Sequence, residues 1–139
     1  MTVALLCLMI FALWTLCLVI FGIGGYRIVA VLKFKKPPNA FPADQAHEGA
    51  HWYKRCQRAH LNCVENLPIF ASAVFMASVL NFSNTTFDAL AQIYVIARIC
   101  QSITHIISTS NLAIHIRFSF FVTQLICVVT MFWQIYSHY

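Results

Sequence analysis

Four apolar stretches dominate the pattern of hydrophobic and polar positions along this chain. Residues 2–26 contain no Asp, Glu, Lys, Arg or His, and a helix needs about 20 apolar residues to cross the hydrocarbon core of a bilayer. Three further apolar stretches of helical length follow, separated by short polar segments. The pattern predicts four membrane-spanning helices over residues 3–33, 52–80, 89–109 and 112–136.

The composition is typical of a chain that lies mostly inside a membrane. Of the 139 residues, 60% are hydrophobic and only 9% are charged, whereas soluble domains contain about 45–50% apolar and about 25% charged residues. The predicted spans leave little room for a separate soluble domain. We therefore expect an all-α integral membrane protein in which residues 1–139 form one four-helix transmembrane domain.

Prolines and polar clusters mark the expected ends and bends of these helices. Pro37 and Pro38 end the first helix, because proline lacks an amide N–H and restricts the residue before it. Pro68 lies inside the second helix and predicts a kink there. We expect a polar turn over residues 81–88 and a break between the last two helices over residues 108–111.

The basic residues indicate how the chain is oriented. Most of the nine Lys and Arg residues lie in or beside the connection between the first two helices, and Arg117 follows the last connection. The positive-inside rule places these two connections in the cytoplasm and both chain ends outside it. This asymmetry explains the formal net charge of +5 without a nucleic-acid partner.

One line of polar residues runs along the start of the second helix. At about 100° per residue, its members fall on one narrow helical face: Arg55, Arg58, Asn62 and Glu65. Such groups are costly at membrane depth unless another protein group or a ligand pairs with them. The second helix is therefore the first candidate for a functional site.

The third helix carries a second polar line on one of its sides, made of Tyr94, Arg98, Gln101, Ser102 and His105. A purely structural interpretation is an ion pair between Glu65 and Arg98. That pair leaves Arg55, Arg58 and Arg117 unexplained, and this surplus of positive charge suits an anionic ligand. Guanidinium groups match carboxylates, a carboxylate matches an ammonium group, and an asparagine amide can pair with a peptide bond. The residues alone thus indicate a small anionic or zwitterionic ligand.

The pattern Arg58-Ala59-x-x-Asn62-x-x-Glu65, followed by Pro68, resembles the signature of the MAPEG family, the membrane-associated proteins in eicosanoid and glutathione metabolism. The longer pattern Arg-Cys-x-Arg-Ala-His-x-Asn-x-x-Glu, which begins at Arg55, is most similar to the branch of the membrane prostaglandin E synthase. This resemblance implies a homotrimer of four-helix subunits that binds glutathione between neighbouring subunits.

The resemblance also implies individual roles. Arg58, Asn62 and Glu65 match the family's glutathione ligands on the second helix, and Arg98 matches an arginine on the third. Gln101 and His105 stand in place of tyrosines found in some members, and Lys33 stands near an arginine on the first helix. The full implied binding set is Lys33, Arg55, Arg58, Asn62, Glu65, Arg98, Gln101 and His105. Arg117 is the candidate for the arginine that stabilises the glutathione thiolate.

The implied function is that of a membrane-bound glutathione transferase or peroxidase in detoxification or lipid metabolism. A thiol has a pKa of about 8.5, and a nearby guanidinium favours its charged form. The thiolate attacks a lipophilic electrophile or reduces a hydroperoxide that arrives from the membrane lipid. The bacterial inner membrane and the endoplasmic reticulum both remain possible locations.

One alternative from another functional class stays open. The family also contains a non-catalytic branch, which implies a lipid-binding or scaffold protein. A solute carrier is disfavoured because the chain shows no inverted repeat or pair of discontinuous helices.

The run from His47 to His51 fits the zinc-protease pattern H-E-x-x-H, which requires both histidines on one face of a helix. Here the run follows Pro37-Pro38 and contains Gly49. Intramembrane metalloproteases, which this pattern resembles, also use a later aspartate as a metal ligand. The only later aspartate in this sequence is Asp88, and the predicted topology places it on the opposite side of the membrane. We therefore interpret the run as a solvated loop and expect no metal site.

Overall fold

The computed structural model describes residues 1–33, 37, 40–41 and 49–138 of the chain. Its elements in order are α1 (Val3–Cys17), the π-helical segment η1 (Leu18–Gly24), α2 (Gly25–Leu32), α3 (His51–Val79), α4 (Thr85–Ile107) and α5 (Asn111–His138). The first three run on as one spanning helix, Val3–Leu32, and four helices are long and apolar enough to cross a membrane. This confirms the predicted all-α, four-span fold.

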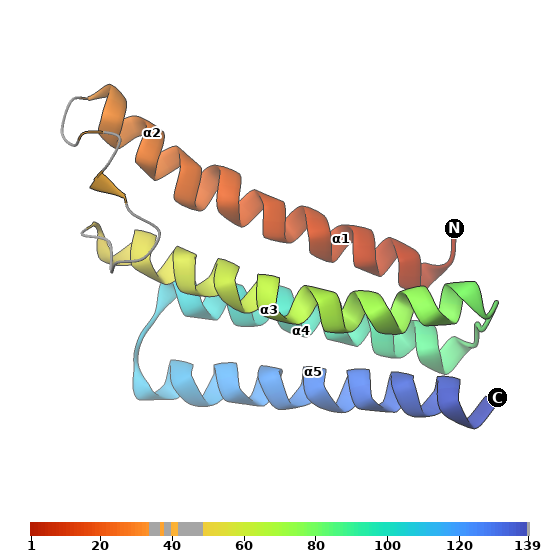
Figure 1. The fold of residues 1–139 in the computed structure, drawn as a ribbon. Helices are drawn as coiled ribbons and strands as arrows, with labels where there is room; N and C mark the ends of the chain where they lie inside the picture. Colours follow the sequence, from red (N-terminus) through yellow and green to blue (C-terminus); the bar gives the residue numbers. More distant parts are fainter. Residues whose placement is uncertain (34–36, 38–39, 42–48, 139) are drawn as a thin grey trace.

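The four spanning helices lie side by side, with both chain ends and the α3–α4 connection at the same end of the bundle (Figure 1). The α2–α3 and α4–α5 connections lie at the opposite end. Helix α4 is central because it packs against α1, α3 and α5. At the end that carries the α2–α3 connection, α2 diverges from α3 (Figure 1), and this divergence makes room for the cavity described below.

Aromatic packing joins α1, α3 and α4 in the middle of the bundle. The rings of Phe70 and Tyr94 are stacked with their centroids 4.4 Å apart. The ring of Phe11 lies 6.1 Å from each of them, in tilted contacts, and all three side chains are fully buried. Offset and tilted aromatic pairs of this kind add to the stabilisation from burial, so the three helices are held firmly where they meet.

Side-chain caps set the helix boundaries and correct two predicted ones. The Oδ1 atom of Asn84 accepts a hydrogen bond of 2.7 Å from the amide of Phe87, which is the geometry of an N-cap. Helix α4 therefore begins at Thr85, before the predicted start at residue 89. The Oγ atom of Ser110 similarly accepts from the amide of Ala113 at 3.2 Å, so α5 begins immediately after it.

Two further features concern the interior of the helices. Helix α3 continues through Pro68 as a single helix, in agreement with the predicted span. The first spanning helix contains the π-helical segment η1, which nothing in the apolar pattern predicted. There Gly22 packs so closely on α3 that a Cβ atom at this position would collide with the Sγ atom of Cys56. The Sγ atom of Cys56 also lies 3.8 Å from the carbonyl oxygen of Leu18.

Candidate functional site

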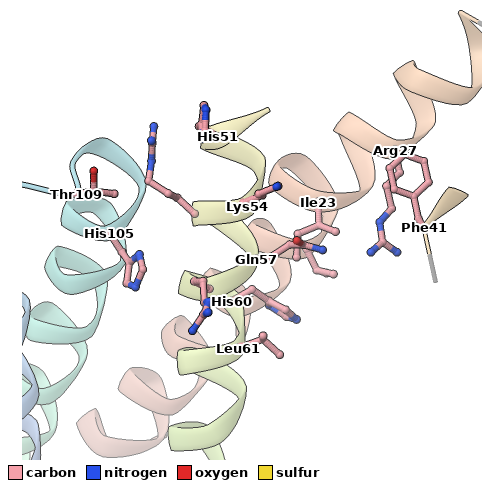
Figure 2. A pocket seen from close by; sticks show the side chains of 13 residues that line it. Ile23, Arg27, Phe41, His51, Lys54, Gln57, His60, Leu61, His105 and Thr109 are labelled. Carbon is pink, nitrogen blue, oxygen red and sulfur yellow. The ribbon is translucent and has the colours of Figure 1, made fainter. Parts of the chain in front are cut away.

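A cavity of about 940 Å³ opens at the end of the bundle that holds the α2–α3 connection. This volume is near the upper end of the range of about 300–1,000 Å³ found for ligand sites. His105 of α4 and Thr109, just after the end of that helix, lie on one side of α3, and Ile23 and Arg27 of the first spanning helix lie on the other (Figure 2). The described lining comprises Val19, Ile23, Arg27, Phe41, His51, Lys54, Arg55, Gln57, Arg58, His60, Leu61, His105 and Thr109.

The charge of this cavity is positive. Its formally charged residues are arginines and a lysine, and no acidic side chain is among the described residues that line it. The Nδ1 atoms of His60 and His105 are buried and have no hydrogen-bond partner within the described part of the chain. The charges of Arg117, Arg58 and Arg55 all act on the His105 ring. The cavity is therefore built to attract an anion.

Arg55 links the wall of the cavity to the end of α4. Its Nε atom donates a hydrogen bond of 2.6 Å to the carbonyl oxygen of Ile106, one of the last carbonyls of α4, which have no partner within the helix itself. A cation is also favourable at a helix C-terminus. Arg58, one turn further along α3, is exposed in the cavity, so its guanidinium group is the more accessible of the two.

The wall between α2 and α3 is organised around Tyr53, which is fully buried. Its hydroxyl oxygen accepts hydrogen bonds from Nε of Arg27 at 2.9 Å and from Nε2 of Gln57 at 3.1 Å. The ring of Tyr26 stacks on that of Tyr53 at 4.3 Å, and the Arg27 guanidinium lies 5.4 Å from the centre of the Phe41 ring. Although the backbones of α2 and α3 diverge here, these side-chain contacts connect the end of the first spanning helix to α3.

The polar line of α3 faces outward from the bundle. Arg58 and Glu65 are exposed and Asn62 is half-buried, while the opposite face of the same helix is buried, at Tyr53, Cys56, Ala59 and Cys63. From this line the cavity includes only Arg55 and Arg58. Asn62 and Glu65 continue the line beyond the cavity along the outer surface of α3.

The polar line of α4 faces inward, and the expected ion pair between Glu65 and Arg98 does not form. Arg98 is only 1% exposed, its Nη1 atom donates to Oε1 of Gln101 at 2.9 Å, and its guanidinium lies 5.9 Å from the centre of the Phe11 ring. Its Nε and Nη2 atoms have no hydrogen-bond partner among the described residues. The purely structural interpretation is therefore wrong for this chain, because Glu65 is exposed on the outside of the bundle and Arg98 is buried inside it.

The remaining predicted site residues lie around the cavity rather than in its lining. Lys33 is exposed and follows the last residue of α2. Arg117 is half-buried on α5, and its carbonyl oxygen accepts a hydrogen bond of 3.0 Å from Nε2 of Gln101. Of the predicted site residues, the cavity thus brings together Arg55, Arg58 and His105.

The histidine-rich run is only partly visible, because His47 and Glu48 lie outside the described residues. Elsewhere in the described part of the chain, no group of three or more His, Cys, Asp or Glu side chains is placed to hold a metal ion.

Comparison with protein families identifies the class of this bundle. A model of the MAPEG family matches residues 3–137. The chain belongs to the MAPEG family. No curated protein and no solved structure matches it. MAPEG proteins are membrane proteins of glutathione and eicosanoid metabolism, and although the family includes glutathione transferases, some of its members are not catalytic. The match extends the resemblance seen in the α3 motif to nearly the whole chain.

Two groups of residues in this MAPEG bundle escaped the sequence analysis. The first group is Arg27, Lys54 and His60, which line the cavity. The aromatic residues beside the α2–α3 connection could have drawn attention to this region, because such residues gather at membrane interfaces. Gln124, on α5, is 1% exposed. An isolated glutamine in an apolar span is costly unless it is hydrogen-bonded, and that rule could have singled it out.

Proposed function

We propose that this MAPEG protein is a membrane-bound glutathione transferase or glutathione peroxidase. The observation that carries the proposal is the position of Arg58. This arginine of the α3 motif lies in a large cavity whose charged lining is basic. Glutathione is a peptide with two carboxylates, one amino group and one thiol, so it carries a net negative charge that suits this cavity.

The proposed contacts follow from the chemistry of the side chains. Arg58, supported by Arg55, pairs with a glutathione carboxylate, because a guanidinium forms two parallel hydrogen bonds to such a group. Glu65 pairs with the ammonium group and the amide of Asn62 with a peptide bond. His105 borders the same space from α4. Lys33 supplies positive charge at the membrane surface. Arg98 and Gln101 lie deeper in the bundle and belong to the support of the site.

Arg117 is proposed to stabilise the glutathione thiolate. In the transferase reaction the thiolate sulfur forms a bond to an electrophilic carbon, and the anion produced takes up a proton from water. In the peroxidase reaction two glutathione molecules are oxidised to the disulfide while the hydroperoxide is reduced to an alcohol and water. A guanidinium that favours the thiolate accelerates both reactions, since the thiolate is the nucleophile.

The outward position of Glu65 supports a site shared between subunits. Glu65 lies midway along α3 (His51–Val79) and is exposed on this single chain. A carboxylate that faces lipid at mid-membrane is costly and needs a partner. We propose that a neighbouring subunit covers the outer polar face of α3 and completes the glutathione site there. The number of subunits, three, rests on the family resemblance.

We further propose that the cavity end of the bundle faces the cytoplasm, in a bacterial inner membrane or in the endoplasmic reticulum. Both chain ends lie at the other end of the bundle (Figure 1), and the basic residues gather at the cavity end. Alkaline phosphatase fused to the C-terminus in a bacterial host should be active, because this enzyme matures only outside the cytoplasm. An inactive, stably expressed fusion would reverse the proposed orientation.

Substitution of Arg117 tests the catalytic part of the proposal. Arg117→Ala should lower kcat about tenfold or more, because one unit in the thiol pKa corresponds to about 1.4 kcal/mol, while the Kd for glutathione changes little. Initial rates with lipid electrophiles and hydroperoxides measure the effect, and His115→Ala, an exposed position on the same helix, serves as the control. An unchanged rate would remove Arg117 from the mechanism.

A wild-type protein that binds glutathione but turns over none of these substrates would favour the non-catalytic lipid-binding or scaffold role.

A further inference from the structure

A network of three buried polar side chains joins α4 to α5 behind the cavity. Arg98, Gln101 and Gln124 are 1%, 8% and 1% exposed, respectively. The Oε1 atom of Gln101 accepts hydrogen bonds from Nη1 of Arg98 at 2.9 Å and from Nε2 of Gln124 at 3.1 Å. The Nε2 atom of Gln101 donates to the carbonyl oxygen of Arg117 at 3.0 Å. Gln101 is therefore the centre of the network, and the main chain of Arg117 is at its edge.

The chemistry of the partners determines which way the amide of Gln101 points. A guanidinium offers only N–H donors and a backbone carbonyl offers only acceptor lone pairs. The side-chain oxygen of Gln101 must therefore face Arg98, and its nitrogen must face the carbonyl of Arg117. With both lone pairs of Oε1 and one N–H in use, Gln101 has a single N–H left. It is poorly suited to bind a ligand directly, and it does not line the cavity.

The bond to the Arg117 carbonyl acts on the part of α5 that carries the proposed catalytic arginine. Helix α5 packs chiefly on α4, and Gln124 ties the same network to the α5 backbone through a bond of 2.9 Å from its Nε2 atom to the carbonyl of Phe120. Two points of α5 are thus held from one residue of α4. These two contacts fix the position of α5 along its axis and its rotation about that axis, both relative to α4. They thereby also set the direction in which the Arg117 side chain projects from α5.

We propose that Gln101 is a positioning residue for Arg117, with Arg98 orienting its amide and Gln124 supporting it from α5. The inference rests on the proposed function, because it assigns Gln101 an effect on the glutathione thiolate that is exerted through Arg117. It gives the buried polar line of α4 a role that does not require contact with glutathione. Misplacement of a catalytic group by about 1 Å can cost about 100-fold in rate, so even a small shift of α5 is enough to be measured.

The test compares Gln101→Met and Gln101→Glu with wild type in the detergent-purified full chain. Methionine is similar in size but removes all three side-chain hydrogen bonds of Gln101. Glutamate keeps an acceptor for Arg98 and loses the donor to the Arg117 carbonyl, which covers the case in which the methionine variant fails to fold. Calorimetry measures the Kd for glutathione, the ultraviolet absorbance of the thiolate across pH measures the pKa of the bound thiol, and initial rates measure kcat.

Both variants should keep the Kd for glutathione within about threefold, raise the pKa of the bound thiol toward its value in solution, and lower kcat about 10- to 100-fold. Gln92→Met, the same substitution at an exposed position of α4, should leave all three quantities unchanged. Gln101 variants with wild-type thiol pKa and kcat would overturn the inference. Loss of glutathione binding in parallel with kcat would also overturn it, because it would make Gln101 a direct contact. A wild-type protein that does not bind glutathione would overturn the proposed function and this inference together.

Discussion

Arg98 carries a positive charge into the middle of the bundle, and its environment there is polar without being acidic. Its Nη1 atom is hydrogen-bonded to Gln101, and the face of the Phe11 ring lies 5.9 Å from its guanidinium. Two of its nitrogen atoms have no hydrogen-bond partner among the described residues. A buried charge held in this way contributes little to stability, because the cost of removing it from water is only partly offset.

Arg98→Met should therefore leave the fold intact and should not lower the stability of the protein. An apolar side chain of similar volume removes the cost of keeping this charge away from water, and the same replacement of buried ion pairs is often neutral or stabilising by about 1–4 kcal/mol. Thermal unfolding in detergent measures the change, and Gln92→Met, at an exposed site of the same helix, is the control and should be close to neutral. A loss of several kcal/mol in Arg98→Met would show instead that the charge is paired, as the rejected ion pair between Glu65 and Arg98 would require.

At the scale of whole elements, η1 is held against α3 by the close approach of Gly22 to Cys56. The π-helical segment widens the helix locally, and such segments are rare in proteins and are often found at functional sites. Val19 and Ile23 of this segment line the cavity, and Arg27 lines it four residues further along the same spanning helix. The contact between Gly22 and Cys56 therefore controls the position of one cavity wall.

Gly22→Ala should destabilise the protein by about 1–3 kcal/mol, the usual cost of overpacking a close contact. The new Cβ atom meets the Sγ atom of Cys56 but lies 3.4 Å from its Cβ atom. Cys56→Ala should therefore relieve most of the cost, and thermal unfolding of both single variants and the double variant measures this coupling. Gly25→Ala is the matched control, because its added Cβ would lie at an ordinary 3.6 Å from the carbonyl of Ile20. Equal losses in Gly22→Ala with and without Cys56→Ala would contradict the account.

The apolar pattern was sufficient to predict that four helices exist and roughly where they lie, since twenty or so apolar residues have few alternatives in a membrane. It was not sufficient for the boundaries of α4. The N-cap at Asn84 was visible in the sequence but was interpreted as part of a turn. The π-helical segment could not be predicted, because the apolar pattern does not distinguish π-helix from α-helix and the contact of Gly22 with Cys56 joins residues more than thirty positions apart.

The site was predictable in its residue types and less so in its geometry. The helical spacing placed Arg55 and Arg58 on one face, and both line the cavity. It could not show that the polar faces of α3 and α4 point in different directions, because a helical wheel describes one helix and says nothing about its rotation in the bundle. For the same reason the role of Gln124 became visible only when α5 was placed beside α4.

At the scale of the whole molecule, the bundle separates its functions along its length. Aromatic packing around Phe11, Phe70 and Tyr94 holds the middle, and the divergence of the first spanning helix from α3 opens the basic cavity at one end (Figure 1). The central claim is that this cavity, together with the outer polar face of α3, binds glutathione. All further claims about thiolate chemistry depend on it.

The most direct test of that claim is calorimetric titration of glutathione into the detergent-purified wild type, Arg58→Ala and Arg58→Lys. Wild type should bind, and Arg58→Ala should bind at least about tenfold more weakly, since a hydrogen bond to a charged group is worth about 1.5–3 kcal/mol. Arg58→Lys should lie between them, because lysine keeps the charge and loses the two-pronged geometry. Wild-type protein that does not bind glutathione, or an Arg58→Ala variant that binds it equally well, would contradict the account.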